Sequence, residues 1–151
     1  MAVLGISHVA VGVSDMERAL LFYRDIIGLR VTLDAVEGAF TGDPDAYRRR
    51  AVYLRAEDGP HASFIVLDQQ LDREPFGKPP RILQLGTHHF SFWVDDLQAI
   101  FDRMVAEGFR PIVRPTASSP AAYGEQAGSG QVLTAIVKDQ DGNPVQLDQR
   151  L

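Results

Sequence analysis

The stretch Thr87-His88-His89-Phe90-Ser91-Phe92-Trp93-Val94-Asp95-Asp96-Leu97 decides the fold, because the chain opens with a stretch of the same pattern, Ser7-His8-Val9-Ala10-Val11-Gly12-Val13-Ser14-Asp15-Met16. In each stretch a histidine precedes alternating residues, an acidic residue seven places on, and a helix-like run. The two histidines, His8 and His89, lie 81 residues apart, and so do the acidic residues that follow them. A half-chain period predicts two copies of one folding unit.

Each unit is predicted to run strand, helix, strand, strand, strand. In the opening strand of the first unit the valines share one face, and His8 shares the other face with small neighbours. Ser14-Asp15 provides a helix N-cap and Gly28 a helix terminator, and Asp95-Asp96 and Gly108 do so in the second unit. The predicted helices are 16–27 and 97–107, and the predicted strands are 5–13, 30–36, 50–56, 62–67, 89–94, 110–114, 131–138 and 144–148.

The predicted domain organisation follows from these units. Residues 1–68 form the first βαβββ module and residues 87–151 the second. The segment 69–86, which contains three prolines, is predicted to link them. A loop-rich segment, 115–130, is predicted inside the second module.

Composition excludes several classes of protein. The 151 residues are 45% hydrophobic and 23% charged, which is ordinary for a globular chain. The net charge of −5 argues against nucleic acid as a partner. The absence of cysteine excludes disulfides, zinc–thiolate sites and thiol catalysis. No apolar run is long enough to span a membrane and no secretory signal is visible, so we expect a cytoplasmic protein that does not enter a membrane.

Several stretches resemble a known family. His8-Val9-Ala10-Val11, Asp15-Met16-Glu17-Arg18-Ala19 and Phe22-Tyr23-Arg24-Asp25-Ile26-Ile27-Gly28-Leu29 resemble the first unit of the vicinal oxygen chelate superfamily. Asp139-Gln140-Asp141-Gly142-Asn143-Pro144-Val145-Gln146-Leu147 resembles its closing signature. That superfamily contains glyoxalase I, bleomycin-resistance proteins and extradiol ring-cleavage dioxygenases. The resemblance covers nearly the whole chain.

The resemblance implies an α+β fold in which two tandem βαβββ modules form a curved, barrel-like mixed sheet with the helices outside. Its metal ligands come from the first and fourth strands of each module. Carried across by position, these ligands are His8, Val66, His89 and Gln146. The resemblance further implies a small-molecule substrate, a homodimer and a divalent metal ion, with Fe(II) the first candidate and Mn, Ni or Zn also open.

The residues depart from that ligand set at two positions. Val66 cannot bind a metal, and Gln146 stands where the family usually has glutamate, so a metal at His8, His89 and Gln146 would have only neutral ligands. Asp68, Asp148 or Glu125 could restore a carboxylate. The two aspartates, however, lie two places along their strands from the expected position, roughly 7 Å away.

Three further residues are candidates for the site. Trp93 shares the predicted His89 face, where it either stacks on a ring-shaped substrate or fills the core between the units. Tyr123 and Glu125 lie in the predicted loop and are candidate catalytic groups that supply a hydroxyl or move a proton, or else they are surface residues. Of the adjacent histidines His88 and His89, the repeat selects His89 as the ligand.

Two functions remain open from the sequence. The first is a metal-dependent enzyme, most similar to a small extradiol ring-cleavage dioxygenase (an oxidoreductase) or to a glyoxalase-type lyase or isomerase. It would chelate two neighbouring oxygens of a small, possibly aromatic, substrate. The second is a metal-free protein that sequesters a drug or aromatic metabolite, as bleomycin-resistance proteins do. The two histidines favour the enzyme, whereas Val66 and Gln146 favour the binding protein.

Overall fold

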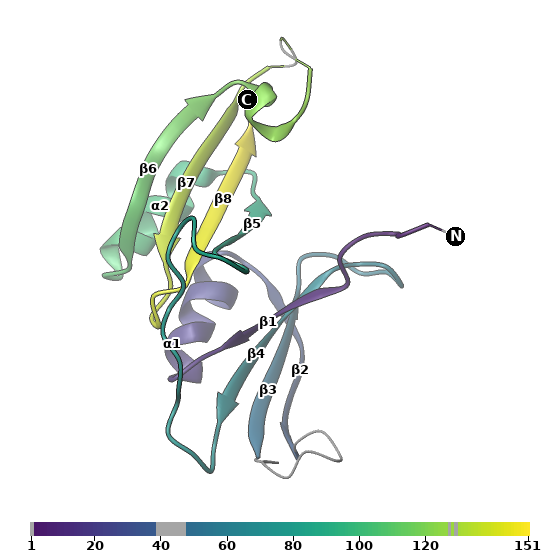
Figure 1. The fold of residues 1–151 in the computed structure, drawn as a ribbon, viewed down its shortest axis with the longest axis vertical. Coiled ribbons are helices and arrows are strands. Elements are labelled where there is room, and N and C mark those ends of the chain that lie inside the picture. Colours follow the sequence, from purple (N-terminus) through teal and green to yellow (C-terminus); the bar gives the residue numbers. More distant parts are fainter. Residues whose placement is uncertain (1, 39–47, 127, 129) are drawn as a thin grey trace. The chain divides into compact units, whose positions relative to one another are not determined.

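A computed structural model describes residues 2–38, 48–126, 128 and 130–151 of the chain (Figure 1). The chain divides into two compact units, Met1–Gly77 and Lys78–Leu151. Each unit holds one four-stranded sheet and is described by itself below. The boundary between the units falls inside the segment 69–86, and its role as a linker stays a prediction.

The first unit is built around a mixed sheet with the strand order β1-β4-β3-β2. β1 runs parallel to β4, and the other neighbours are antiparallel. The short helix after β1 packs against β4. The elements are β1 (His8–Gly12), α1 (Met16–Leu20), η1 (Leu21–Ile26), β2 (Arg30–Glu37), β3 (Arg49–Arg55) and β4 (Phe64–Gln70).

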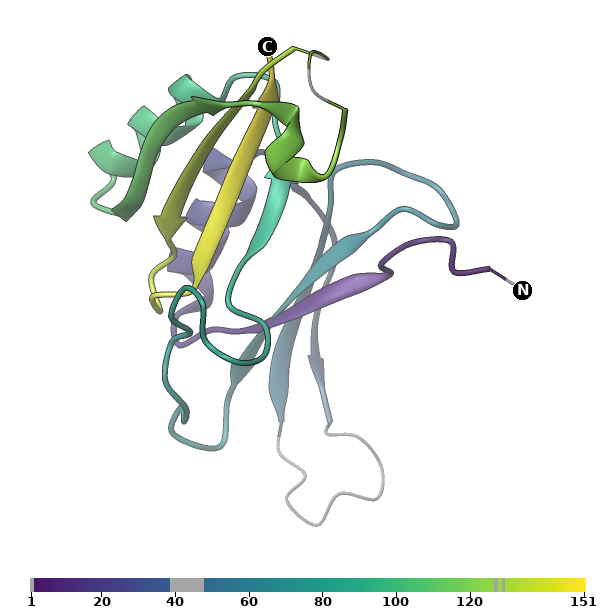
Figure 2. The same cartoon turned by 45° about the horizontal axis from the view of Figure 1, so that its top comes forward.

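The second unit repeats this arrangement with the strand order β5-β8-β7-β6 (Figure 2). β5 and β8 are parallel, and the remaining pairs are antiparallel. The helix α2 packs on β6, β7 and β8. The elements are β5 (Phe90–Trp93), α2 (Leu97–Ala106), β6 (Arg110–Ser118), η2 (Pro120–Tyr123), β7 (Val132–Lys138) and β8 (Pro144–Arg150).

The predicted α+β class and the two tandem βαβββ modules are therefore confirmed. Register makes the two units equivalent position by position. Ala10 of β1 lies opposite Val66 of β4, and Ser91 of β5 lies opposite Gln146 of β8. Since Ala10 and Ser91 are 81 residues apart, Val66 and Gln146 occupy the same place in the two sheets.

Alternation along the strands separates a buried face from a polar one. In β1, Val11 is 6% exposed, whereas His8, Ala10 and Gly12 are exposed, as their pattern predicts. In β8, Val145 and Leu147 are fully buried beneath the helix. The face on which Gln146 lies is the one that carries polar side chains.

The first helix departs from its predicted regular form. Asp15 caps it by accepting a hydrogen bond from the Arg18 amide, as expected, and Gly28 ends it with φ of 93°. From Leu21 onward, however, the helix widens to π-helical geometry. The wider turn rotates the buried face, so that Ile26 is buried, whereas Ile27, which a regular helix would place above Tyr23, is only partly buried.

The strand predicted at 110–114 is longer than expected. β6 continues through Pro115 to Ser118, so the predicted loop begins later than residue 115. Proline is tolerated because β6 is the outer strand of its sheet, where positions whose backbone N–H would face outward make no ladder hydrogen bond. The pairing of β6 with β7 shifts register on either side of Val113, which accommodates the prolines in the ladder.

Candidate functional site

A buried carboxylate, Asp148, is the centre of a polar cluster in the second unit. Its side chain lies on β8 and is 2% exposed. It accepts hydrogen bonds from the hydroxyl of Ser91 on β5, from Tyr123 at 2.6 Å and from Thr134 of β7 at 2.8 Å. Strand register explains the convergence, since Asp148 lies opposite both Thr134 and Trp93.

Gln146, a predicted metal ligand, belongs to the same cluster. It lies two residues before Asp148 and shares its face of the strand. Its Nε2 donates to both carboxylate oxygens of Asp148, at 3.1 and 3.0 Å. This pairing orients the amide, and its Oε1 accepts no hydrogen bond from the residues that the structure describes. The oxygen is the end of the side chain that a metal would use.

No arginine or lysine neutralises Asp148 within the described part of the chain. All the donors that reach it are hydroxyl or amide groups. A buried carboxylate without a counter-charge is costly, and such groups are usually paired or coordinate a metal. The cluster therefore holds a buried carboxylate that pairs with no lysine or arginine among the residues that the structure describes.

His89, the second predicted ligand, lies immediately before β5 and contacts its neighbour. Its Nδ1 is 2.7 Å from the Nδ1 of His88, with ring centroids 4.5 Å apart. Burial and the proximity of His88 lower the pKa of His89, and Asp148 opposes this effect. Its Nε2 has no hydrogen-bond partner among the described residues, so the neutral ring presents one open nitrogen.

His8, the third predicted ligand, belongs to the first unit. It is exposed at the start of β1, stacked on Phe64 with ring centroids 4.9 Å apart. Its Nδ1 lies 3.4 Å from the Ser7 hydroxyl. The meeting of His8 with His89 stays a prediction, because the two residues lie in different units.

The fourth ligand position in the first unit is apolar. Val66 is 5% exposed on β4, and Asp68 follows it on the same face. Asp68 accepts from Arg49 at 2.9 Å, and Arg49 also donates to Glu37 at 2.9 Å. Burial nevertheless raises the pKa of Asp68, against the opposing effect of Arg49. Here the carboxylate pairs with an arginine that it shares with Glu37.

Trp93, the predicted substrate-binding residue, forms one wall of a surface hollow. Its side chain is 56% exposed, and its ring lies 5.9 Å from the ring of Tyr123. The guanidinium of Arg150 lies 4.7 Å from the Trp93 ring centroid. The hollow measures about 580 Å³ and is also lined by Val94, Asp95 and Gln149. An exposed aromatic ring beside such a hollow suits a planar ligand.

The two candidate catalytic residues lie in different surroundings. Burial and the hydrogen bond to Asp148 raise the pKa of Tyr123, so its hydroxyl stays protonated and acts as a donor. Glu125 accepts from both terminal nitrogens of Arg150, at 2.7 and 2.5 Å, and this pairing lowers the pKa of Glu125. Proton transfer by Glu125 would require it to leave that ion pair.

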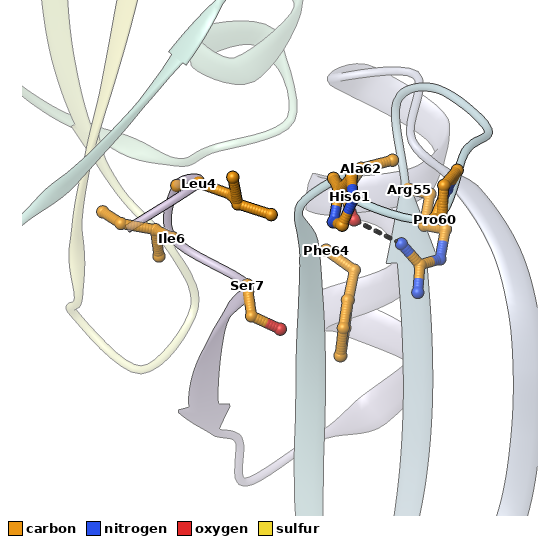
Figure 3. Close-up of a pocket in the computed structure, with 9 residues that line it drawn as sticks. Leu4, Ile6, Ser7, Arg55, Pro60, His61, Ala62 and Phe64 are labelled. Atoms are coloured by element: carbon orange, nitrogen blue, oxygen red, sulfur yellow. Dashed lines mark hydrogen bonds between the residues drawn. The ribbon is translucent and has the colours of Figure 1, made fainter. Parts of the chain in front are cut away.

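A second hollow, of about 210 Å³, lies in the first unit near the start of β1 (Figure 3). Arg55 donates to the Ala62 carbonyl at 2.5 Å at its rim and lies 4.5 Å from the centroid of Phe64. Phe64 lines this hollow and stacks on His8, which is not among the lining residues.

The structure thus brings Gln146, Tyr123 and Trp93 together around Asp148, and pairs Glu125 with Arg150. Within either unit, the described residues contain no group of three or more His, Asp or Glu side chains arranged to hold a metal. Sequence reasoning missed the contributions of Ser91, Thr134 and His88. The i, i+2 spacing of Gln146 and Asp148 was the available signal.

Comparison with known proteins identifies the family. The profile of the Glyoxalase/Bleomycin resistance protein/Dioxygenase superfamily matches residues 5–147. The chain belongs to this superfamily. Its members include the vicinal oxygen chelate proteins that the sequence resembles, so the predicted relationship is confirmed. No curated protein matches the chain.

Solved structures of this superfamily share the fold. A glyoxalase family protein from Bacillus cereus aligns with a TM-score of 0.76 at 16% identity, covering 100% of this chain and 97% of that one. A glyoxalase/dioxygenase from Nostoc punctiforme gives 0.65 at 14% identity, covering 98% and 92%. The trypanothione-dependent glyoxalase I of Leishmania major gives 0.63 at 16% identity, covering 95% and 84%. At these identities the likeness establishes the fold alone.

No helix in the described residues is both long and apolar enough to cross a membrane.

Proposed function

We propose that this protein is a metal-dependent enzyme in which His8, His89 and Gln146 hold a divalent ion, with Fe(II) the first candidate and Mn, Ni or Zn the others. When bound, the ion would act as a Lewis acid on two neighbouring oxygens of a small substrate. Ring-cleavage oxygenation is the first reaction class, and lyase or isomerase chemistry is the second. The named structural relatives include both a glyoxalase/dioxygenase and a glyoxalase I.

The uncompensated carboxylate of Asp148 is the observation that carries this proposal. It lies beside Gln146, whose amide oxygen is open, and among the described residues only hydroxyl and amide groups donate to it. Amide and imidazole groups both ligate divalent metals, so the donor set fits such an ion.

His89 is suited to the ligand role by its neighbour. A ligating imidazole must be neutral, and burial together with His88 lowers the pKa of His89. With the proton on Nδ1 donated to His88, the open Nε2 carries the lone pair. Ligating histidines commonly donate their other nitrogen in this way.

Trp93 and Tyr123 would act on the substrate. The exposed Trp93 ring would stack on a planar substrate, and the Tyr123 hydroxyl would turn its O–H from Asp148, 2.6 Å away, to a substrate oxygen, where it would donate a hydrogen bond or a proton. The raised pKa of Tyr123 favours this role over that of a base. Glu125 remains a candidate for proton transfer once Arg150 is engaged elsewhere.

A metal-free binding protein is the second candidate. The buried Val66 at one ligand position and the hollow beside Trp93 favour it. In that case an aromatic drug or metabolite would stack on Trp93 and the histidines would be ordinary polar contacts. The homodimer and the cytoplasmic location expected from the sequence are proposed for either function.

Metal titration separates the two candidates. Wild-type protein, stripped with EDTA, is titrated with Fe(II) under anaerobic conditions and with Mn(II), Ni(II) and Zn(II), alongside His8→Ala and His89→Ala. We expect wild type to bind at least one ion at micromolar levels and each variant to lose at least 100-fold in affinity. His61→Ala, an exposed histidine outside the site, is the control and should bind as wild type does.

The enzyme proposal fails if wild type binds none of these ions at high micromolar concentration. The single tryptophan, Trp93, then provides the readout for the alternative. Quenching of its fluorescence by aromatic ligands in the presence of EDTA would support the binding protein.

A further inference from the structure

We propose that Asp148 is the positioning residue that makes a neutral ligand at Gln146 effective, by fixing the direction of the Gln146 amide and by supplying the negative charge that this residue lacks. The inference rests on the proposed metal-binding function. It gives a role to a carboxylate that lies two residues beyond the expected ligand position.

The first step is geometric. Because Nε2 of Gln146 donates to both oxygens of Asp148, at 3.1 and 3.0 Å, the amide cannot rotate without losing both bonds. Its Oε1 is therefore held pointing away from Asp148 and, in the described part of the chain, towards no other donor. A fixed acceptor oxygen is what coordination requires.

The second step concerns Asp148 itself. Tyr123, Thr134, Ser91 and Gln146 donate to its oxygens, so binding a metal directly would require it to give up several hydrogen bonds. Its position at 2% exposure makes that costly. Asp148 is thus better suited to act through Gln146 than to coordinate directly.

The third step concerns charge. The donors around Asp148 are hydroxyl and amide groups, whereas Asp68 pairs with a guanidinium, that of Arg49. Coulombic attraction acts over several ångströms at a partly buried site. A divalent ion held at the Gln146 oxygen would be stabilised by this charge without contacting it.

The test exchanges the two side chains. Mn(II) affinity is measured by titration for wild type, Asp148→Asn and the double variant Gln146→Glu/Asp148→Asn. Loss of the charge in Asp148→Asn should weaken binding 10- to 100-fold, the usual effect of removing a partner of a ligating group. The double variant again has one carboxylate and one amide at these two positions, so its Mn(II) affinity should return towards that of wild type.

Recovery distinguishes positioning from damage to the fold, because Gln146→Glu cannot repair a collapsed core. Asp68→Asn is the matched control in the first unit and should leave Mn(II) affinity unchanged. Thermal unfolding of every variant confirms that the titrated proteins are folded. Should Asp148→Asn not fold, the double variant alone carries the test.

The outcomes separate this inference from the function beneath it. If wild type binds Mn(II) and Asp148→Asn binds within threefold of it, the inference is overturned while the proposed function stands. A folded double variant that does not bind also overturns it. If wild type binds none of the four ions, the function fails and the inference fails with it.

Discussion

Two carboxylates at equivalent places in the two units are hydrogen-bonded by different kinds of group. Asp68 lies opposite Gly12 in the first sheet, and Asp148 lies opposite Trp93 in the second. Arg49 pairs with Asp68 at 2.9 Å, next to the apolar Val66. Around Asp148 the donors are hydroxyls and the Gln146 amide.

The difference shows that the two copies of a duplicated fold can contribute different groups to one site. The first unit pairs its acidic group with Arg49, which also pairs with Glu37, so its contribution to the proposed site is limited to His8. The second unit leaves its acidic group without a cation among the described residues and surrounds it with the other candidate residues. Equivalent backbone positions therefore do not imply equivalent chemistry.

The largest expected effect tests whether the two sheets are equally important for stability. Leu67 and Leu147 occupy equivalent places in β4 and β8, and both are 0% exposed. Replacing either by alanine should cost about 2–5 kcal/mol of unfolding free energy, through lost burial and a residual cavity. Chemical denaturation measures both. Leu33→Ala, at a position 46% exposed, is the control and should change little.

If the two variants lose clearly different amounts of unfolding free energy, the two sheets are not equivalent, because one of them then carries most of the stability. Two separate unfolding transitions, each shifted by only one variant, would show instead that the units unfold independently.

The next effect contrasts the charged and neutral partners of the two aspartates. Arg49→Met would leave Asp68 and Glu37 without their cation, and should cost about 1–3 kcal/mol, allowing for partial exposure of the pairs. Thr134→Val removes one neutral donor from Asp148 and should cost about 1 kcal/mol. Urea unfolding compares the two, and equal losses would contradict the distinction.

A smaller effect is expected from the pH dependence of His89. Its pKa is lowered from 6.5, first by burial and then by His88. The unfolded chain therefore binds the proton more readily, so His89 should make unfolding easier as pH falls from about 6.5 through its lowered value. Titration of histidine ring signals by NMR measures the pKa.

His88→Asn removes one of the two causes while keeping a polar side chain. We expect the pKa of His89 to rise in this variant but to stay below 6.5, because burial remains. A pKa unchanged by the substitution would show that the contact between the two rings has no electrostatic effect.

The smallest effect should be seen only by fluorescence. Arg150→Met removes the guanidinium 4.7 Å from the Trp93 ring centroid and frees Glu125 from its ion pair. Both groups are exposed, so stability should hardly change. The emission of Trp93 should shift, because its charged neighbour is gone. An unchanged spectrum would place the Arg150 side chain elsewhere in solution.

The sequence predicted the fold well because the fold depends on pattern. The repeat and the alternation of apolar residues identify the modules, and the caps at Asp15 and Asp96 mark where helices begin. The π-helical turn after Leu20 and the extension of β6 were not predicted, since both depend on packing and register rather than on local preference.

The site was less accessible to sequence reasoning for a related reason. Spacing alone places Gln146 and Asp148 on one face, yet the separation along the strand made Asp148 look too distant to matter as a ligand. The donors Thr134, Tyr123 and Ser91 come from other elements, and only the register of β5, β7 and β8 brings them to it. The sequence therefore identified single candidate residues, but not the residues that hydrogen-bond to them.

The prolines in β6 have a consequence for the behaviour of the chain at high concentration. An outer strand offers unpaired backbone groups to which a strand from another molecule can add. Pro111 and Pro115 lack an N–H, and the register shifts beside them bend the ladder. The two prolines thereby make the outer edge of this sheet a poor template for aggregation between molecules.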